Sequence, residues 1–364
     1  MTISVHMLVR DGATVVERAI KSVVCFATEV VFVDTGSTDG TPDIIKRACD
    51  VLKIGCSGVA ISPLSRPDLF FPDVPSSWRC RFDSTFTGLP LLRDFAAARN
   101  LGLDLCTGDY VCKLDADDAY AGTLEEVARV TNNLNMPGVL LVASPYLVMC
   151  RDGVSVDRVE TYTRFWRNES RVRFSEVCHE NVDHLRTKTN FVVVVDGTAF
   201  CDRQDSTGRG ARLPHRNFKT LLREYERLEA AGEAPSAHLC MYLADEAADV
   251  VPTLPFEIFA GNFRGLSLCD SDAAWAYLIM GRCHEKLGGG RSAIAEAYSR
   301  SADLGCARAR LLLALYYERE GGCSDLPTML RDAIATNSGI CYPQGAKLSE
   351  IARARELLSR WERS

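Results

Sequence analysis

Several signatures of exported, membrane-bound and zinc-stabilised proteins are missing from this sequence. No apolar run reaches the roughly 20 residues that a membrane-spanning helix needs. The start, MTISVHMLVRDG, has no basic segment followed by an apolar core, so no secretory signal is expected. The fifteen cysteines include no CxxC pair, which disfavours both a zinc site and a disulfide framework. Free, buried thiols fit a reducing compartment, so we expect a cytoplasmic protein (in the host cytoplasm if the chain is viral).

The sequence also lacks a strong excess of charge of one sign. It holds 42 Lys and Arg against 48 Asp and Glu, a formal net charge of −6. This balance disfavours a protein that coats nucleic acid over its whole surface. Two segments are locally basic: residues 151–173 hold six arginines against four acids, and residues 203–227 hold six arginines and one lysine against three acids. These arginines could bind phosphates, although pairing with neighbouring acids in solvent has somewhat more weight.

The first half of the chain alternates strand and helix patterns. Apolar, β-branched runs that predict buried strands occur at residues 3–9, 29–34, 109–115 and 138–149. Helical spacing of apolar residues occurs at residues 12–24, 37–50, 95–106 and 122–134. This order predicts an α/β domain with a mostly parallel sheet and helices on both faces. Residues 55–92 are rich in Pro, Ser and Gly, so we expect an irregular insertion there.

From about residue 213 the pattern is helical only. Short amphipathic segments are separated by Gly-rich or polar turns, and similar apolar pairs recur about every 34–36 residues, at 243–244, 279–280 and 312–314. This period indicates stacked helical hairpins of the tetratricopeptide type, with a plain helical bundle as the alternative. The chain is therefore predicted to have an α/β domain at 1–212 and an all-α, TPR-like domain at 213–364.

An aspartate stands where the second predicted strand ends. Asp34 closes the run EVVFVD and is followed by the turn TGSTDGT. Ligands of open α/β sheets bind at the carboxyl ends of strands, where a carboxylate could accept hydrogen bonds from a base or a ribose. A turn in which Asp34 and Asp39 cap the following helix explains the pattern about equally well.

Three aspartates follow the third predicted strand, in KLDADD. Asp115 and Asp117 are two residues apart, so their side chains can converge at the strand end. Two close carboxylates repel unless a cation lies between them or one is protonated. Oxygen ligands suit Mg²⁺ or Mn²⁺, which could bridge to a diphosphate. Taken alone, a polar turn before the next helix is an equally simple interpretation.

Together the motifs resemble the family 2 glycosyltransferases of the GT-A fold. The resemblance is carried by VDTGSTDGT, RDFAAARNLGL and LDADD, and it continues through TRFWRN and CHENV. The helical tail after HRNFKTLL is similar to members with TPR-like C-terminal domains. This resemblance covers most of the chain, and it says little about the acceptor.

The resemblance implies a role for each matching residue. Asp34 would contact the uracil or ribose of a UDP-sugar, and Val9, Arg99 and Asp115 would also lie at the nucleotide. Asp115 and Asp117 would hold the Mn²⁺ or Mg²⁺ ion, Asp117 more directly. Family members generally invert the anomeric carbon, and this requires one general base. Glu180 is the first candidate for that base, and Asp118 is the second.

Two departures concern the metal ligands and the first loop. Family members often have Asn-Glu after the first strand, whereas this chain has Asp11-Gly12. Many relatives carry a histidine on the last strand before the helical domain, whereas this chain reads AFCDRQDS. Asp202 would then take over this role, or the third protein ligand of the metal is missing and His179 serves instead.

The sequence therefore predicts a metal-dependent, inverting hexosyltransferase with a UDP-sugar donor. Glucose is the expected sugar on family frequency alone. The acceptor would be a hydroxyl or thiol of a macromolecule, with protein or peptide and hydroxymethylated viral DNA ranked almost level. A helical repeat domain binds polypeptides or forms dimers, so a homodimer is an alternative to a monomer. The competing hypothesis is a non-catalytic TPR-type adaptor with a degenerate transferase domain.

Overall fold

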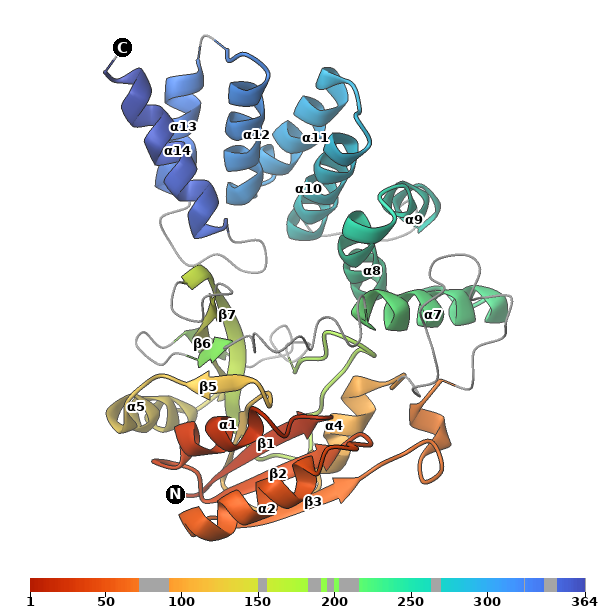
Figure 1. Cartoon of the computed structure of the whole chain (residues 1–364), viewed down its shortest axis with the longest axis vertical. Helices are drawn as coiled ribbons and strands as arrows, with labels where there is room; N and C mark the ends of the chain where they lie inside the picture. Colours follow the sequence, from red (N-terminus) through yellow and green to blue (C-terminus); the bar gives the residue numbers. More distant parts are fainter. Residues whose placement is uncertain are drawn as a thin grey trace. The chain divides into compact units, whose positions relative to one another are not determined.

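A computed structural model describes residues 1–71, 92–149, 156–182, 191–194, 200–202, 216–262, 270–323, 325–336 and 346–363 (Figure 1). The chain divides into two compact units. The first holds Met1–Tyr146 and Tyr162–Thr207, and the second holds Leu147–Thr161 and Gly208–Ser364. The boundary predicted between residues 212 and 213 lies outside the described residues and stays a prediction.

The described strands form one mixed sheet of nine strands. Their order is β3-β2-β1-β4-β7-β6-β9-β5, and β8 pairs with β6. The strands are β1 (Ile3–Val9), β2 (Glu29–Asp34), β3 (Gly55–Ala60), β4 (Tyr110–Lys113), β5 (Asp118–Tyr120), β6 (Val139–Met149), β7 (Val156–Arg167), β8 (Phe191–Val194) and β9 (Phe200–Asp202).

Parallel pairing in the first part of the sheet gathers three strand ends at one edge. β1 pairs in parallel with both β2 and β4, with Val9 opposite Asp34 and His6 opposite Lys113. The carboxyl ends of these strands carry Asp34 and the residues that follow β4. β4 pairs with β7, and β5 with β9, in antiparallel fashion. The sheet is thus less uniformly parallel than the sequence predicted, because β7 and β9 return along the strands that bear the aspartates.

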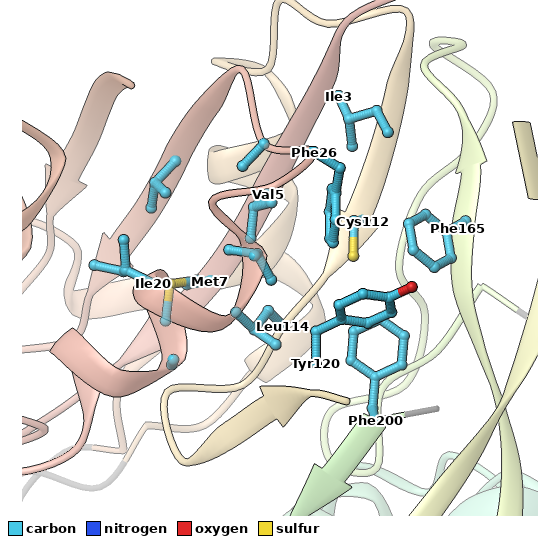
Figure 2. Packing of buried hydrophobic residues seen from close by; sticks show 14 of the residues in the cluster. Ile3, Val5, Met7, Ile20, Phe26, Cys112, Leu114, Tyr120, Phe165 and Phe200 are labelled. Carbon is cyan, nitrogen blue, oxygen red and sulfur yellow. The ribbon is translucent and has the colours of Figure 1, made fainter. Parts of the chain in front are cut away.

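Helices cover both faces of β1. On one face Val5 and Met7 pack with helices α1 (Val16–Val23) and α2 (Thr41–Leu52) in a buried apolar cluster, part of which Figure 2 shows. On the other face His6 lies against α4 (Phe95–Leu103), whose Gly102 leaves no room for a Cβ. Helix α5 (Leu124–Leu134) begins with a capping box at Thr123. Because successive side chains of a strand point to opposite faces, Val5 and Met7 face one side of β1 and His6 faces α4 on the other.

The second unit is helical in its described residues apart from its share of β6 and β7. Its helices are α7 (Arg216–Ala231), α8 (Ala237–Val250), α9 (Leu254–Asn262), α10 (Asp270–Lys286), α11 (Arg291–Asp303), α12 (Ala307–Arg319), α13 (Leu326–Thr336) and α14 (Leu348–Trp361). The repeated apolar pairs lie on α8, α10 and α12, and each pair contributes buried residues. Adjacent helices approach closely, because a Cβ on Gly281 would come 2.5 Å from the Tyr298 ring.

The predicted fold class, an α/β domain followed by an all-α domain, is confirmed. One local expectation is wrong: residues 55–60, predicted to be irregular, form β3, an edge strand that is parallel to β2. Its sequence, GCSGVA, has little apolar character because most of its side chains are at least partly exposed. No helix in the described ranges is long and apolar enough to cross a membrane.

Candidate functional site

Asp34 combines a turn contact with a free acceptor atom. Its Oδ2 accepts hydrogen bonds from the backbone N–H groups of Gly36 (3.2 Å) and Ser37 (3.1 Å). Gly36 has a φ of +97°, which a residue with a side chain would adopt only with strain. The other oxygen, Oδ1, is buried and has no hydrogen-bond partner among the described residues. One oxygen thus holds the turn, and the other remains available to a donor from a ligand.

The loops after β1 and β2 are tied together. The backbone N–H of Asp11 donates to the Ser37 hydroxyl (2.8 Å), and the Asp11 carboxylate accepts from the Thr38 N–H (2.8 Å). The carbonyl of Val9 accepts from the Thr35 N–H (2.9 Å), while the Val9 side chain is buried in the core. Val9 could therefore line a nucleotide site only through its backbone.

An ion cluster lies beyond the end of β4. We use this name for Arg99, Lys113, Asp115, Asp118, Arg164 and Glu180. Arg99, on α4, donates from Nη2 to Asp115 Oδ1 and from Nε to Glu180 Oε1, the latter at 2.5 Å. Lys113 Nζ lies 3.6 Å from Glu180 Oε1 and 4.0 Å from Asp115 Oδ2. Three segments far apart in the sequence thus meet in these contacts.

Arg164, on β7, completes the ion cluster from the other side. Its Nη1 lies 2.9 Å from Asp118 Oδ2 and 3.7 Å from Asp115 Oδ2. The Tyr146 hydroxyl donates to Asp118 Oδ1 (2.8 Å). The Arg164 guanidinium also lies over the Tyr146 ring, 4.6 Å from its centroid. Only 3% of the Arg164 side chain and 1% of the Asp118 side chain are exposed, so this ion pair is sheltered from solvent.

The ion cluster shifts the protonation of its acids in opposite directions. Burial alone would raise the pKa of Asp115, but Lys113, Arg99 and Arg164 outweigh burial and hold that pKa far below its usual range. Burial is likewise opposed at Glu180, where Arg99 and Lys113 lower the pKa to about 2. At Asp118 burial prevails over the attraction of Arg164, and the pKa rises to about 7. Asp115 and Glu180 are therefore anionic at neutral pH, whereas Asp118 is poised to exchange a proton.

His6 adds a neutral ring beside these charges. Both of its nitrogens are buried and lack hydrogen-bond partners among the described residues. Burial, reinforced by the nearby Arg99, lowers the pKa of His6 to about 3. Its ring centroid lies 5.8 Å from that of Phe174, and Phe174 also lies 5.5 Å from the Arg99 guanidinium. His6 therefore spaces β1 from α4 without adding charge.

The residues predicted to bind a metal do not assemble into a ligand set in the described structure. Asp115 is surrounded by cations, and Asp117 accepts a hydrogen bond at its backbone oxygen from Arg18 Nη2 (3.1 Å). His179 lies in the loop before Glu180 with a φ of +56°. Asp202 pairs with Asp118 between β9 and β5, and its side chain lies outside the described residues. Among the described residues no three His, Cys, Asp or Glu side chains are placed to hold one ion.

The charges around Asp115 also oppose a divalent cation. Two unit charges 4 Å apart interact by about 4 kcal/mol at an effective dielectric constant near 20, and the repulsion doubles for a divalent ion. Lys113 and Arg164 both lie within 4.0 Å of Asp115 Oδ2, and Arg99 binds Oδ1. The described residues therefore do not fit a metal at Asp115.

Two residues of the ion cluster, Lys113 and Arg164, and their neighbour Tyr146 were not singled out from the sequence. Lys113 precedes the aspartates and was read as part of a buried strand. Arg164 lies in TRFWRN, where the buried neighbours Phe165 and Trp166 suggest a strand interior. An arginine within such an apolar run is the one signal that could have marked a buried ion pair, since Arg is seldom buried unless it is paired.

The comparisons with known proteins find distant sequence relatives of two kinds. No protein-family model matches the chain. A TPR repeat-containing protein of Synechococcus elongatus is 27% identical over 183 residues, which are 50% of this chain and 35% of that protein. The SPbeta prophage-derived glycosyltransferase SunS of Bacillus subtilis is 24% identical over 235 residues, 63% of this chain and 46% of that protein.

Two of the solved structures to which the chain is similar are as follows. Staphylococcus aureus TarS (residues 1–349) in complex with UDP-GlcNAc is 16% identical, with 94% of this chain and 93% of that chain covered and a TM-score of 0.40. Glucosyl-3-phosphoglycerate synthase of Mycobacterium tuberculosis with Mn²⁺, UDP and its product is 15% identical, with 65% and 82% covered and a TM-score of 0.37. At these scores the structures carry no argument about the site. The chain is similar in sequence to two curated proteins, and it spans about a third to a half of their lengths.

Proposed function

We propose that the first unit is a glycosyltransferase that moves a sugar from a nucleotide sugar, with a uridine diphosphate donor as the first choice. The observation that carries this proposal is the pairing of two features at the carboxyl ends of parallel strands. One is the buried, unpartnered Oδ1 of Asp34, and the other is the ion cluster beyond β4. The first suits a donor group of a nucleoside, and the second suits a diphosphate. The sequence similarity to SunS, a glycosyltransferase by name, supports the same class.

The reaction would be a single displacement. The acceptor oxygen or sulfur attacks the anomeric carbon and forms the new bond. The bond from that carbon to the diphosphate oxygen breaks, and the electron pair leaves with the diphosphate. The acceptor proton passes to a base of the protein. Attack on the face opposite the leaving group inverts the anomeric configuration, as the resemblance to family 2 implies.

Glu180 and Asp118 are the two proposed bases. With its pKa near 2, Glu180 is a weak base while Arg99 and Lys113 engage it. A diphosphate that binds these cations would release Glu180 and raise its pKa toward the neutral range, which favours proton transfer. Asp118 has the better matched pKa, but it is almost fully buried. We therefore keep Glu180 as the first candidate and Asp118 as the second.

Metal dependence stays a prediction from the sequence motif of Asp115 and Asp117. If a divalent ion is bound, Asp117 is the first candidate to hold it, with His179 and Asp202 as candidate partners. Such an ion would supply positive charge to the leaving diphosphate. The sugar, with glucose as the default, is likewise proposed from the resemblance.

The acceptor is proposed to be a macromolecule. A TPR-type helical unit suits a polypeptide acceptor or a dimer contact, and the similarity to a TPR repeat-containing protein supports that unit. Hydroxymethylated DNA is the other candidate, for which the basic segments 151–173 and 203–227 provide the charge. Residues 151–155 and 203–215 of these segments lie outside the described residues.

The test is a panel of nucleotide sugars with detection of released nucleoside diphosphate, followed by peptides and hydroxymethylcytosine DNA as acceptors. We expect release from a UDP-sugar and loss of that release in Asp34→Asn. The matched control is Asp68→Asn, an exposed aspartate paired with Arg66. No turnover of any donor, with no nucleotide binding, would favour the adaptor hypothesis instead.

A further inference from the structure

Both carboxylate oxygens of Asp115 already face cations of the protein. Arg99 Nη2 binds Oδ1, while Arg164 Nη1 lies 3.7 Å and Lys113 Nζ 4.0 Å from Oδ2. A carboxylate at the first position of a DxD pair is expected to face a metal ion. In this chain its charge is balanced from three separate elements, namely α4, β4 and β7.

Two donor nitrogens of the arginines in the ion cluster have no acceptor among the described residues. Arg99 Nη1 and Arg164 Nε are buried and without a hydrogen-bond partner among the described residues. A guanidinium carries five N–H donors, and a buried donor that lacks an acceptor destabilises the fold. Phosphate oxygens are acceptors that match the fork of a guanidinium. These two donors therefore point to an anionic ligand.

The cations are held in place before any ligand arrives. Arg164 lies over the rings of Tyr146 (4.6 Å) and Phe200 (5.2 Å). Arg99 and Lys113 lie 5.5 and 5.8 Å from the ring of Phe174. Charges fixed in this way need no reorganisation when negative charge develops on a ligand. Solvated surface arginines would lack this order.

We propose that Arg99, Lys113 and Arg164 supply the positive charge that neutralises the diphosphate, so that a nucleoside diphosphate binds this chain without a divalent cation. The inference rests on the proposed function and replaces its divalent metal ion with these three side chains. Three cations face three carboxylates (Asp115, Asp118 and Glu180). To reach the cations, the diphosphate therefore displaces one of these carboxylates. Glu180 is the carboxylate exchanged, since it binds both Arg99 and Lys113 and lies in a loop outside the helices and strands.

Calorimetry with UDP as the probe tests this inference on the full chain. The protein is measured after treatment with EDTA and again in excess Mn²⁺. We expect the same affinity, within about twofold, in both buffers, and we expect the affinity to fall with rising salt. Lys113→Met should weaken UDP binding by about ten- to a hundredfold in both buffers, because a charge-assisted hydrogen bond is lost. Arg171→Met, an exposed arginine paired with Glu169, should leave the affinity unchanged.

Arg164→Met is the second variant, and circular dichroism first establishes that it folds. If Arg164→Met unfolds because Asp118 has lost its partner, the UDP affinity of Lys113→Met alone tests the inference. UDP binding that requires Mn²⁺ and disappears in Asp117→Asn would overturn this inference and leave the proposed function standing. Absence of UDP binding in both buffers would overturn both.

Discussion

Arg99 and Glu180 form a buried ion pair across 81 residues of sequence, with Nε and Oε1 2.5 Å apart. Only 5% of the arginine side chain and 9% of the glutamate side chain are exposed. The pair ties α4 to the loop after β7. Arg99 also binds Asp115, so this one guanidinium links two residues that the sequence assigned to different tasks, a metal site and a general base.

Substitution of Glu180 tests how much the Arg99–Glu180 ion pair contributes to the stability of the fold. Glu180→Ala would leave Arg99 with one buried partner fewer, and the free energy of unfolding should fall by about 3 kcal/mol. Glu180→Gln keeps an acceptor oxygen, so a smaller loss of about 1 kcal/mol is expected. Urea unfolding monitored by circular dichroism measures both. Glu169→Ala, which removes the solvent-accessible pairs of Glu169 with Arg167 and Arg171, should change stability by about 1 kcal/mol at most. Equal effects at Glu180 and Glu169 would contradict the prediction.

The raised pKa of Asp118 predicts a characteristic dependence of stability on pH. An acid ionises near pH 4 in an unfolded chain, whereas Asp118 does so at about 7 in the fold. Between these values the folded state binds the extra proton, so stability attributable to Asp118 is present at low pH and is lost as the pH rises from about 4 to 7. Asp118→Asn, which keeps an acceptor for Tyr146, should flatten this decline.

The slope at its steepest is about 1 kcal/mol per pH unit for one proton. Asp115 and Glu180 have lowered pKa values, so their contribution runs the other way and is lost as the pH falls below about 4. Urea unfolding over this pH range separates the two directions. The same slope in wild type and Asp118→Asn would show that another group titrates.

Asp34→Asn is expected to weaken nucleotide binding without harming the fold. Asparagine can keep the acceptor for Gly36 and Ser37, because its carbonyl oxygen replaces Oδ2. Loss of the negative charge should raise the dissociation constant of UDP by about tenfold. The thermal midpoint should stay within a few degrees of wild type. Asp68→Asn, at an exposed ion pair, serves as the matched control, and an equal loss of affinity in that variant would argue against a role for Asp34.

Helices and strands could be predicted from the sequence wherever their buried residues follow a regular pattern. β1 and β2 are continuous apolar runs, because both of their faces are covered, and they were predicted at the residues where they occur. β5 was missed because its three residues, Asp118 to Tyr120, contain a charged residue that tertiary contacts with Arg164 and Tyr146 compensate. Strand propensity cannot anticipate such compensation.

Of the candidate site, the sequence pattern predicted mainly the acidic residues. The aspartates stand out at strand ends, whereas their cations come from α4, β4 and β7, and no local pattern links Arg99 or Arg164 to Asp115. The sequence predicted a metal ion beside these acids, and that ion stays a prediction; the cations Arg99, Lys113 and Arg164 that face Asp115 were not linked to it. Long-range ion pairs depend on sheet order, which was not predicted strand by strand.

Gly102→Ala tests the close approach of α4 to β1. A Cβ at this position would come 2.3 Å from His6 Nε2 and 2.9 Å from a Val33 methyl, both in buried strands. Neither can move far in a packed core, so we expect a loss of about 1 to 3 kcal/mol in the free energy of unfolding. Gly290→Ala is the control, because its φ is −62° and no atom lies within 4 Å of the added methyl. His6→Ser in combination with Gly102→Ala should recover part of the loss, since the smaller side chain removes the nearest clash, and a double-mutant cycle measures that coupling. Strict additivity of the two changes would show that the His6 ring does not set the distance between β1 and α4, and that the strain falls on Val33 instead.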